Sequence, residues 1–190
     1  MSAYWFFAAV AFVLSLVLNG WLIQVSHRRG WFLPEIRPRD WHQQPTPRVG
    51  GIGLCLGFLL TIGLVALSSA QSLNFSGQTY LGLDRNLFGL ILAILLLGAV
   101  NIIDDYRGLS WPIKLACQIS AALIIVAFGV LIPTLSNPFG GQIVLAGSAW
   151  LLVVVWLVVT SNVVNWLDGI DGLAGGVSTI TLVVLFLLSI

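Results

Sequence analysis

Six long apolar runs dominate the sequence, and they restrict the folds that this chain can adopt. The runs cover residues 4–25, 50–69, 87–103, 113–132, 149–165 and 174–190. About 20 apolar residues are enough for a helix to cross a bilayer, where only helices and closed barrels satisfy every backbone hydrogen bond. With 58% hydrophobic and 8% charged residues, the composition excludes a water-soluble domain. The sequence therefore predicts an all-α, polytopic transmembrane helical bundle that forms one domain over residues 1–190.

The basic residues are concentrated in two of the loops between these runs. Seven of the eight Lys and Arg residues lie in the first and third loops, and Arg85 is the exception. Short loops rich in Lys and Arg are retained in the cytoplasm. We therefore expect the first, third and fifth loops on the cytoplasmic side of the plasma (inner) membrane and the N-terminus outside. The net charge of +1 gives no reason to expect a nucleic acid partner.

The fourth loop, residues 133–148, differs from the others because it has no ionisable residue. It contains the turn signals Asn137-Pro138 and Gly140-Gly141 before a short apolar stretch. These signals favour a small hairpin on the outer side of the membrane.

The first cytoplasmic loop ends in a group of potential anion ligands. Arg39, His42, Thr46 and Arg48 precede the pair Gly50-Gly51. Two guanidinium groups, an imidazole and a hydroxyl beside flexible glycines can bind a polyanion through charge-assisted hydrogen bonds. The alternative is that the arginines only fix the topology and the prolines and glycines only form the turn into a helix. The two interpretations are equally good on this segment alone.

The third loop begins with two acidic residues that follow an uninterrupted apolar run. Asp104 and Asp105 lie at the membrane interface, where carboxylates are costly and are usually kept for an ion path, a metal or catalysis. Gly108 can form a turn and Pro112 suits the first turn of a helix, so a helical hairpin can bring Lys114 back to the acids. Two carboxylates and a lysine suit a phosphate bridged by a divalent cation. The alternative is an ordinary interfacial ion pair.

The fifth loop holds the most specific pattern. Asn162, Asn165 and Asp168 recur every third residue, so on a continuing helix they lie within an arc of about 120° and can converge on one ligand. Their oxygen donors suit a hard cation such as Mg²⁺. Gly169 and its neighbours are expected to end the helix and to let Asp171 turn toward a nucleotide. A helix cap explains one Asp-Gly pair, but it explains poorly two such pairs beside two amides.

Together the three segments resemble the motifs of the polyprenyl-phosphate N-acetylhexosamine-1-phosphate transferase family, in the same order and with similar spacing. The matching segments are Arg39-x-x-His42-x-x-Pro45-Thr46-Pro47-Arg48-x-Gly50-Gly51, Asp104-Asp105 with Lys114, and Asn162-x-x-Asn165-x-x-Asp168-Gly169-x-Asp171-Gly172-Leu173-Ala174. The last is highly specific and the first two are moderately so. The Pro-Thr-Pro-Arg form is more similar to the branch that primes O-antigen, enterobacterial common antigen or teichoic acid synthesis than to the peptidoglycan branch.

The resemblance implies a reaction and a role for each motif. A polyprenyl phosphate oxygen would attack the β-phosphorus of a UDP-N-acetylhexosamine, with Mg²⁺ required and UMP released. Asp104 or Asp105 would activate or position the lipid phosphate, and Lys114 would bind phosphate. Asn165 would bind the metal ion. The residues expected to bind the substrates are Asn162, Asp168, Gly169 and Asp171, with Arg39, His42, Thr46 and Arg48 of the first loop.

The sequence also departs from the family pattern. Members have about ten spans and a later cytoplasmic loop rich in His and Arg, so this chain is expected to be a truncated N-terminal portion that is inactive alone. A homodimer is compatible with the sequence. The rival interpretations are a secondary transporter, whose polar residues would lie near the middle of the membrane, and an inactive relative that serves as a scaffold.

Overall fold

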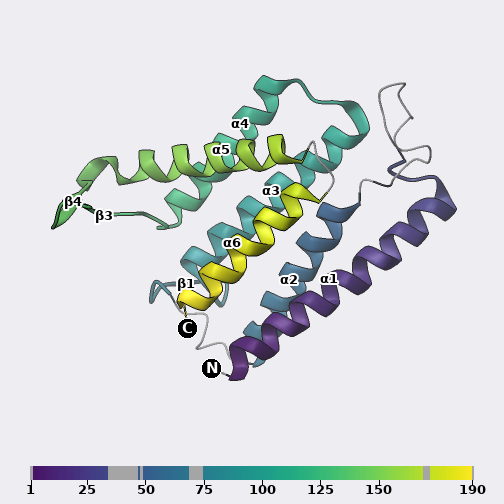
Figure 1. Cartoon of the computed structure of the whole chain (residues 1–190), viewed down its shortest axis with the longest axis horizontal. Helices are drawn as coiled ribbons and strands as arrows, with labels where there is room; N and C mark the ends of the chain where they lie inside the picture. Colours follow the sequence, from purple (N-terminus) through teal and green to yellow (C-terminus); the bar gives the residue numbers. More distant parts are fainter. Residues whose placement is uncertain (1, 34–46, 48, 69–74, 169–171, 190) are drawn as a thin grey trace.

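The computed structural model describes residues 2–33, 47, 49–68, 75–168 and 172–189, and this part of the chain is almost entirely helical (Figure 1). Its six α-helices are α1 Ser2–Arg29, α2 Gly50–Ser68, α3 Arg85–Arg107, α4 Trp111–Ala127, α5 Ala149–Leu167 and α6 Leu173–Ser189. Each helix coincides with one of the apolar runs, so the prediction of a helical fold is confirmed.

Four of these helices, α1, α2, α3 and α5, are long and apolar enough to cross a membrane. Helices α4 and α6 are apolar but have 17 residues each, which is about 26 Å at the helical rise and less than the hydrocarbon thickness of about 30 Å. The expected end of the fourth run at residue 132 is wrong. Helix α4 ends at Ala127 because Gly129, with φ +105°, takes the left-handed backbone conformation that glycine adopts at low cost.

Two short hairpins join helices at the end of the bundle opposite the expected cytoplasmic loops. Strand β1 (Thr79–Tyr80) pairs antiparallel with β2 (Leu83–Asp84), and β3 (Thr134–Ser136) pairs with β4 (Gln142–Val144). A 3-10 turn, η2 (Ala146–Ser148), leads into α5. The β3–β4 pair confirms the hairpin predicted in the fourth loop.

Neighbouring helices pack mainly in sequence order: α1 lies along α2, α3 along α4, and α4 against α5. Small residues let α1 and α2 approach closely. A Cβ atom added to Gly53 or Gly57 would overlap the side chain of Asn19 or Ser15 on α1. Close backbone approach at small residues is a common way for helices to associate in membranes.

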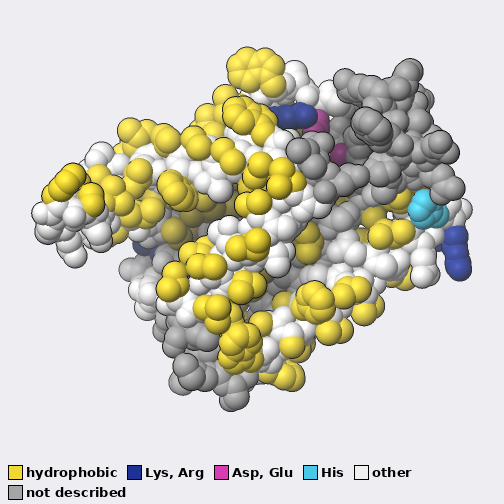
Figure 2. Space-filling model, viewed as in Figure 1, with side chains coloured by type: hydrophobic (Ala, Val, Ile, Leu, Met, Phe, Trp, Pro, Cys, Tyr) yellow, Lys and Arg dark blue, Asp and Glu magenta, His cyan; other side chains and the backbone are white. Residues whose placement is uncertain are grey.

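The surface of the bundle is largely apolar, as Figure 2 shows over the helices that face the viewer. Many large hydrophobic side chains are exposed, including Phe12 at 67% and Leu188 at 79%. Apolar surface of this extent is expected where lipid rather than water surrounds the protein.

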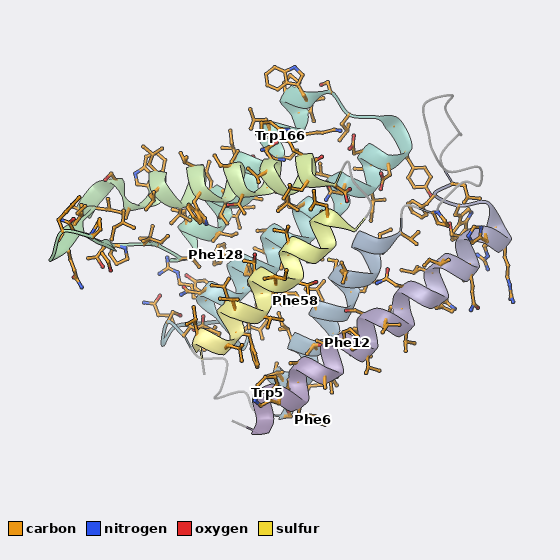
Figure 3. All side chains as sticks on the ribbon, viewed as in Figure 1. Trp5, Phe6, Phe12, Phe58, Phe128 and Trp166 are labelled. Atoms are coloured by element: carbon orange, nitrogen blue, oxygen red, sulfur yellow. The ribbon has the colours of Figure 1, made fainter. Side chains whose placement is uncertain are left out.

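The beginning of α1 also meets the end of α6, where the rings of Trp5, labelled in Figure 3, and Phe186 are in edge contact with centroids 4.9 Å apart.

The described helix ends that flank the odd-numbered loops lie at one end of the bundle. In Figure 1, α1, α3 and α5 finish at the upper right, where α2, α4 and α6 begin. We call this the motif end, because it carries Asp104, Asp105, Lys114, Asn162 and Asn165. The two strand hairpins lie at the opposite end.

Candidate active site

The turn between α3 and α4 builds the acidic part of the motif end. Helix α3 ends at Arg107 and is capped by Gly108, whose φ of +64° is left-handed and whose N–H donates to the carbonyl oxygen of Asp104 at 2.8 Å. Ser110 then precedes α4 with an extended backbone, and Pro112 occupies its first turn. Glycine is favoured after a helix because it adopts the left-handed conformation at low cost, and proline is favoured in the first turn because its missing N–H would have no partner there. The expected helical hairpin is therefore present.

Asp104 is held by partners on both of its carboxylate oxygens. Its Oδ2 forms an ion pair with Lys114 Nζ at 2.7 Å, and its Oδ1 accepts a hydrogen bond from the Leu109 N–H at 2.8 Å. The side chains are partly exposed, 25% for Asp104 and 40% for Lys114. The hairpin thus brings Lys114 to the acids, as expected, and it does so at the first of the two.

Asp105 lies in different surroundings from its neighbour. It is exposed and lines one end of a cavity of about 500 Å³ between α2 and α3. We call this cavity the α2–α3 groove; its lining includes Gly51, Cys55, Gly98 and Asn101. Two carboxylates adjacent in sequence therefore face different surroundings, because consecutive helical residues point about 100° apart.

The end of α5 carries the polar residues of the fifth-loop motif. The helix continues through Leu167, so Asn162 and Asn165 lie on one helical arc, with Asp168 at its C-cap. Asn165 and Asp168 are exposed, whereas Asn162 is half-buried. The side chain of Asn162 donates from Nδ2 to Gln118 Oε1 at 2.7 Å and to the Val158 carbonyl at 2.8 Å.

Gln118 is a residue that the sequence reasoning missed. It follows Lys114 by four positions, so both side chains lie on one face of α4. On this face of α4, Lys114 pairs with Asp104 of α3. Gln118 accepts a hydrogen bond from Asn162 of α5. A polar residue one turn after a candidate site lysine, inside an apolar helix, is a signal that could have found it.

Comparison with known proteins identifies the lineage of this site. The sequence model of glycosyl transferase family 4 matches residues 87–190, which include both described motifs. The chain belongs to glycosyl transferase family 4. The family resemblance seen in the sequence is thereby confirmed, and the three helices α3, α4 and α5 that form the site all contribute to the matched segment.

The chain is similar in sequence to curated transferases. It is 34% identical over 183 residues to the decaprenyl-phosphate N-acetylglucosaminephosphotransferase of Mycolicibacterium smegmatis, covering 95% of this chain and 43% of that protein. It is 31% identical over 145 residues to the probable undecaprenyl-phosphate N-acetylglucosaminyl 1-phosphate transferase of Bacillus subtilis, covering 76% of this chain and 37% of that protein.

A relative whose name states a different transferred group is also similar. The phospho-N-acetylmuramoyl-pentapeptide-transferase of Lactobacillus delbrueckii subsp. bulgaricus is 31% identical over 190 residues, covering 90% of this chain and 56% of that protein. No solved structure matches the chain. The chain spans less than half the length of the first two curated relatives.

Several expected site residues of this family member lie outside the part of the chain that the structure describes. They are Arg39, His42, Thr46, Arg48, Gly169 and Asp171. Their segments join α1 to α2 and α5 to α6, which end and begin at the motif end.

The donor chemistry of the described part of the site fits a hard cation. No three His, Cys, Asp or Glu side chains gather as a metal site within the described residues. The exposed amide of Asn165 and carboxylate of Asp168 are oxygen donors, the kind that Mg²⁺ prefers, and Mg²⁺ commonly takes only one or two protein ligands together with substrate phosphates.

Proposed function

We propose that this chain is part of an enzyme that transfers N-acetylglucosamine 1-phosphate from UDP-N-acetylglucosamine to a polyprenyl phosphate and releases UMP. The observation that carries the proposal is that α4 joins the two motifs at one end of an apolar bundle, since Lys114 pairs with Asp104 and Gln118 bonds Asn162, in a member of glycosyl transferase family 4. The names of the mycobacterial and Bacillus relatives support a polyprenyl phosphate acceptor and an N-acetylglucosamine phosphate as the transferred group, and the name of a putative transferase of Sulfolobus acidocaldarius supports UDP-N-acetylglucosamine as the donor. Such a product would initiate the synthesis of a cell-surface polysaccharide.

The position of the polar residues supports transfer over transport. Within the described chain, the Asp, Lys and Arg side chains lie in loops or within a few residues of a helix end. A transporter binds its substrate near the middle of the membrane. A site at one face suits a soluble nucleotide that meets an embedded lipid. We place this face in the cytoplasm because the loops there hold most of the basic residues.

The two aspartates differ in role under this proposal. Asp105 accepts the proton of a monoprotonated lipid phosphate, whose oxygen then forms a bond to the β-phosphorus of the UDP-sugar. The bond between this phosphorus and the oxygen bridging to the α-phosphate breaks, and UMP leaves with the bridging oxygen. Asp104 holds Lys114 in position, and the ammonium group stabilises negative charge on the reacting phosphates.

The α5 residues serve the nucleotide under the same proposal. Asn165 would bind Mg²⁺, which would supply neutralisation of the pyrophosphate charge when bound. Asp168, Gly169 and Asp171 bind the uridine and pyrophosphate, and the arginines of the first loop bind phosphate oxygens. Gln118 fixes the side chain of Asn162 through their hydrogen bond and so orients this face of α5.

The test uses membranes that contain the full-length native protein, incubated with UDP-[³H]GlcNAc, polyprenyl phosphate and Mg²⁺. We expect label to enter the lipid phase, with UMP formed in matching amount, and EDTA to abolish both. An absence of labelled lipid with UDP-N-acetylglucosamine and with other UDP-N-acetylhexosamines would overturn the proposal.

One variant tests the assignment of α5 in the same assay. Asn165→Ala should lower turnover by about a hundredfold or more, because it removes a ligand of the Mg²⁺ that would stabilise the negative charge of the transition state. Asn137→Ala is the matched control, since this asparagine lies in the β3–β4 hairpin at the opposite end and caps its own turn. Equal activity in the two variants would refute the role of Asn165.

A further inference from the structure

The β3–β4 hairpin projects from the bundle at the end opposite the motif end and forms the far left of Figure 1. All six of its strand residues are exposed, so no helix of the described chain covers it. A two-stranded hairpin that packs against nothing is marginally stable at best in water. We therefore expect the hairpin to lie against a partner that the described part of the chain does not supply.

The two faces of the hairpin differ in polarity. Leu135 and Ile143 are directly paired, so their side chains lie together on one face. Both are exposed, and this face is apolar. The other face is mixed near the helices and polar near the tip, and its pairs are Thr134–Val144 and Ser136–Gln142. The hairpin is thus amphipathic, with its polar pair next to the turn.

The tip presents an aromatic side chain on a turn whose backbone is already paired. Asn137 donates its N–H to the Gly141 carbonyl, and its Oδ1 accepts a hydrogen bond from the Phe139 N–H. The Gly140 N–H donates to the Asn137 carbonyl. The Phe139 ring is 96% exposed. Because these backbone groups are paired within the turn, the tip can enter a partly apolar environment at low cost.

The absence of charge and the neighbouring surface favour lipid as the partner. Residues 133–148 have no ionisable side chain, whereas surfaces that face water are usually rich in charged residues. Trp150, which is 45% exposed in the first turn of α5, lies between the hairpin and the apolar surface of that helix. Tryptophan is enriched where a membrane meets water. The hairpin therefore continues the surface that the bundle turns toward lipid.

The backbone of the hairpin determines how deep it can lie. Each strand has one edge without a neighbouring strand, and the N–H and C=O groups of such an edge need hydrogen-bond partners. Headgroups and water offer these partners, but the hydrocarbon core does not. The fitting depth is the headgroup region.

We infer that the β3–β4 hairpin is a membrane-surface contact in the headgroup region of the leaflet opposite the motif end. Leu135, Phe139 and Ile143 point toward the acyl chains, and Ser136 and Gln142 point toward water. This inference does not rest on the proposed function, because the hairpin lies at the other end of the bundle from the candidate active site.

The test places the environment-sensitive fluorophore NBD at single cysteines of the full-length protein in phosphatidylcholine–phosphatidylglycerol vesicles, with the native cysteines replaced by alanine. Phe139→Cys and Ile143→Cys are the test variants, and Gln142→Cys, on the opposite face beside Ile143, is the matched control. At the two test positions we expect blue-shifted emission, strong quenching by lipids with a nitroxide near the headgroup, and weak quenching by iodide added to both sides of the vesicles. The control should show the reverse.

Two results would overturn the inference. Equal iodide quenching at all three positions, without quenching by the lipid nitroxide, would show that the hairpin lies in water. Protection of both test positions from both quenchers would show a protein cover, either another segment of the full-length chain or a second copy of it.

A second measurement needs no variant and stays informative if a labelled turn loses its fold. The unmodified full-length protein is irradiated in vesicles that contain a phosphatidylcholine with a diazirine on its acyl chain close to the headgroup. We expect crosslinks in residues 135–143 as well as at the start of α5. Crosslinks in the helices with none in residues 135–143 would overturn the inference.

Discussion

Helix α3 has acidic side chains at both of its ends, and the partners of the carboxylates differ between the two ends. At the N-terminus, Asp84 accepts hydrogen bonds from the N–H groups of Asn86 and Leu87, which the helix itself leaves unpaired. It also accepts bonds from the N–H groups of Phe75 and Ser76 and from the Ser76 hydroxyl. Burial alone would raise the pKa of Asp84, but the bonds from Ser76, Asn86 and Leu87 lower it to about 2.

At the C-terminus of the same helix, the backbone carbonyls disfavour negative charge. Asp104 is compensated by Lys114 and the Leu109 N–H, and Asp105 lines the groove. Asp84, which accepts backbone N–H groups at the favourable end of the helix, is therefore expected to be a structural residue. Acidic residues gathered at the unfavourable end, beside a lysine and a cavity, are the ones expected to take part in a reaction.

The largest effect should come from removing the acid at the groove. Asp105→Asn in the full-length enzyme should lower turnover by about a hundredfold or more, because an amide cannot accept the phosphate proton. Asp84→Asn is the matched control and should keep normal activity per folded molecule. The measurement is lipid labelling normalised to the amount of folded protein. Equal losses in both variants would erase the distinction between the two ends.

The next effect concerns the lysine that Asp104 holds. Lys114→Met keeps the length of the side chain but removes its charge, and turnover should fall by about tenfold to a thousandfold. Its effect on stability should be small, about 0–1 kcal/mol, because a partly exposed ion pair contributes little to folding. Thermal unfolding in detergent measures the second quantity. A large drop in stability with normal turnover would make the ion pair structural.

A smaller effect, on stability rather than activity, is expected at the other end. Asp84→Ala removes the acceptor that joins residues 75–76 to the first turn of α3. The variant should unfold at a lower temperature than the wild type at neutral pH while retaining its turnover at low temperature. Ser68→Ala, which loses an exposed bond to the Val65 carbonyl within α2, is the control and should unfold like the wild type.

The smallest effect is the pH dependence of that difference. The folded-state pKa of Asp84 is about 2, below the ordinary value of 3.8. The stability that its carboxylate contributes is therefore fully present above the ordinary value and is lost as the pH falls through about 2. The gap in unfolding temperature between wild type and Asp84→Ala should be constant near neutral pH and should narrow in this acidic range. A gap that widens on acidification would contradict the assigned sign.

The sequence predicts the apolar helices and the α3–α4 turn because these depend on local rules. Apolar runs give the helices, and Gly108 and Pro112 give the turn that returns Lys114 to Asp104. The groove could not be predicted, because it depends on how closely α2 and α3 approach. The cap at Asp84 was missed although its signal is local: an acidic residue three positions before the apolar run 87–103. The partner of Asn162 was missed because Gln118 lies 44 residues away.

The measurement that tests the central claim most directly follows the phosphate. Membranes with the full-length native enzyme receive polyprenyl phosphate, Mg²⁺ and UDP-N-acetylglucosamine that carries ³H in the sugar and ³²P in the β-phosphate. Transfer of sugar 1-phosphate predicts equal molar amounts of both labels in the lipid and UMP as the released nucleotide. Tritium in the lipid without ³²P, accompanied by UDP, would contradict the account, because it would show transfer of the sugar alone.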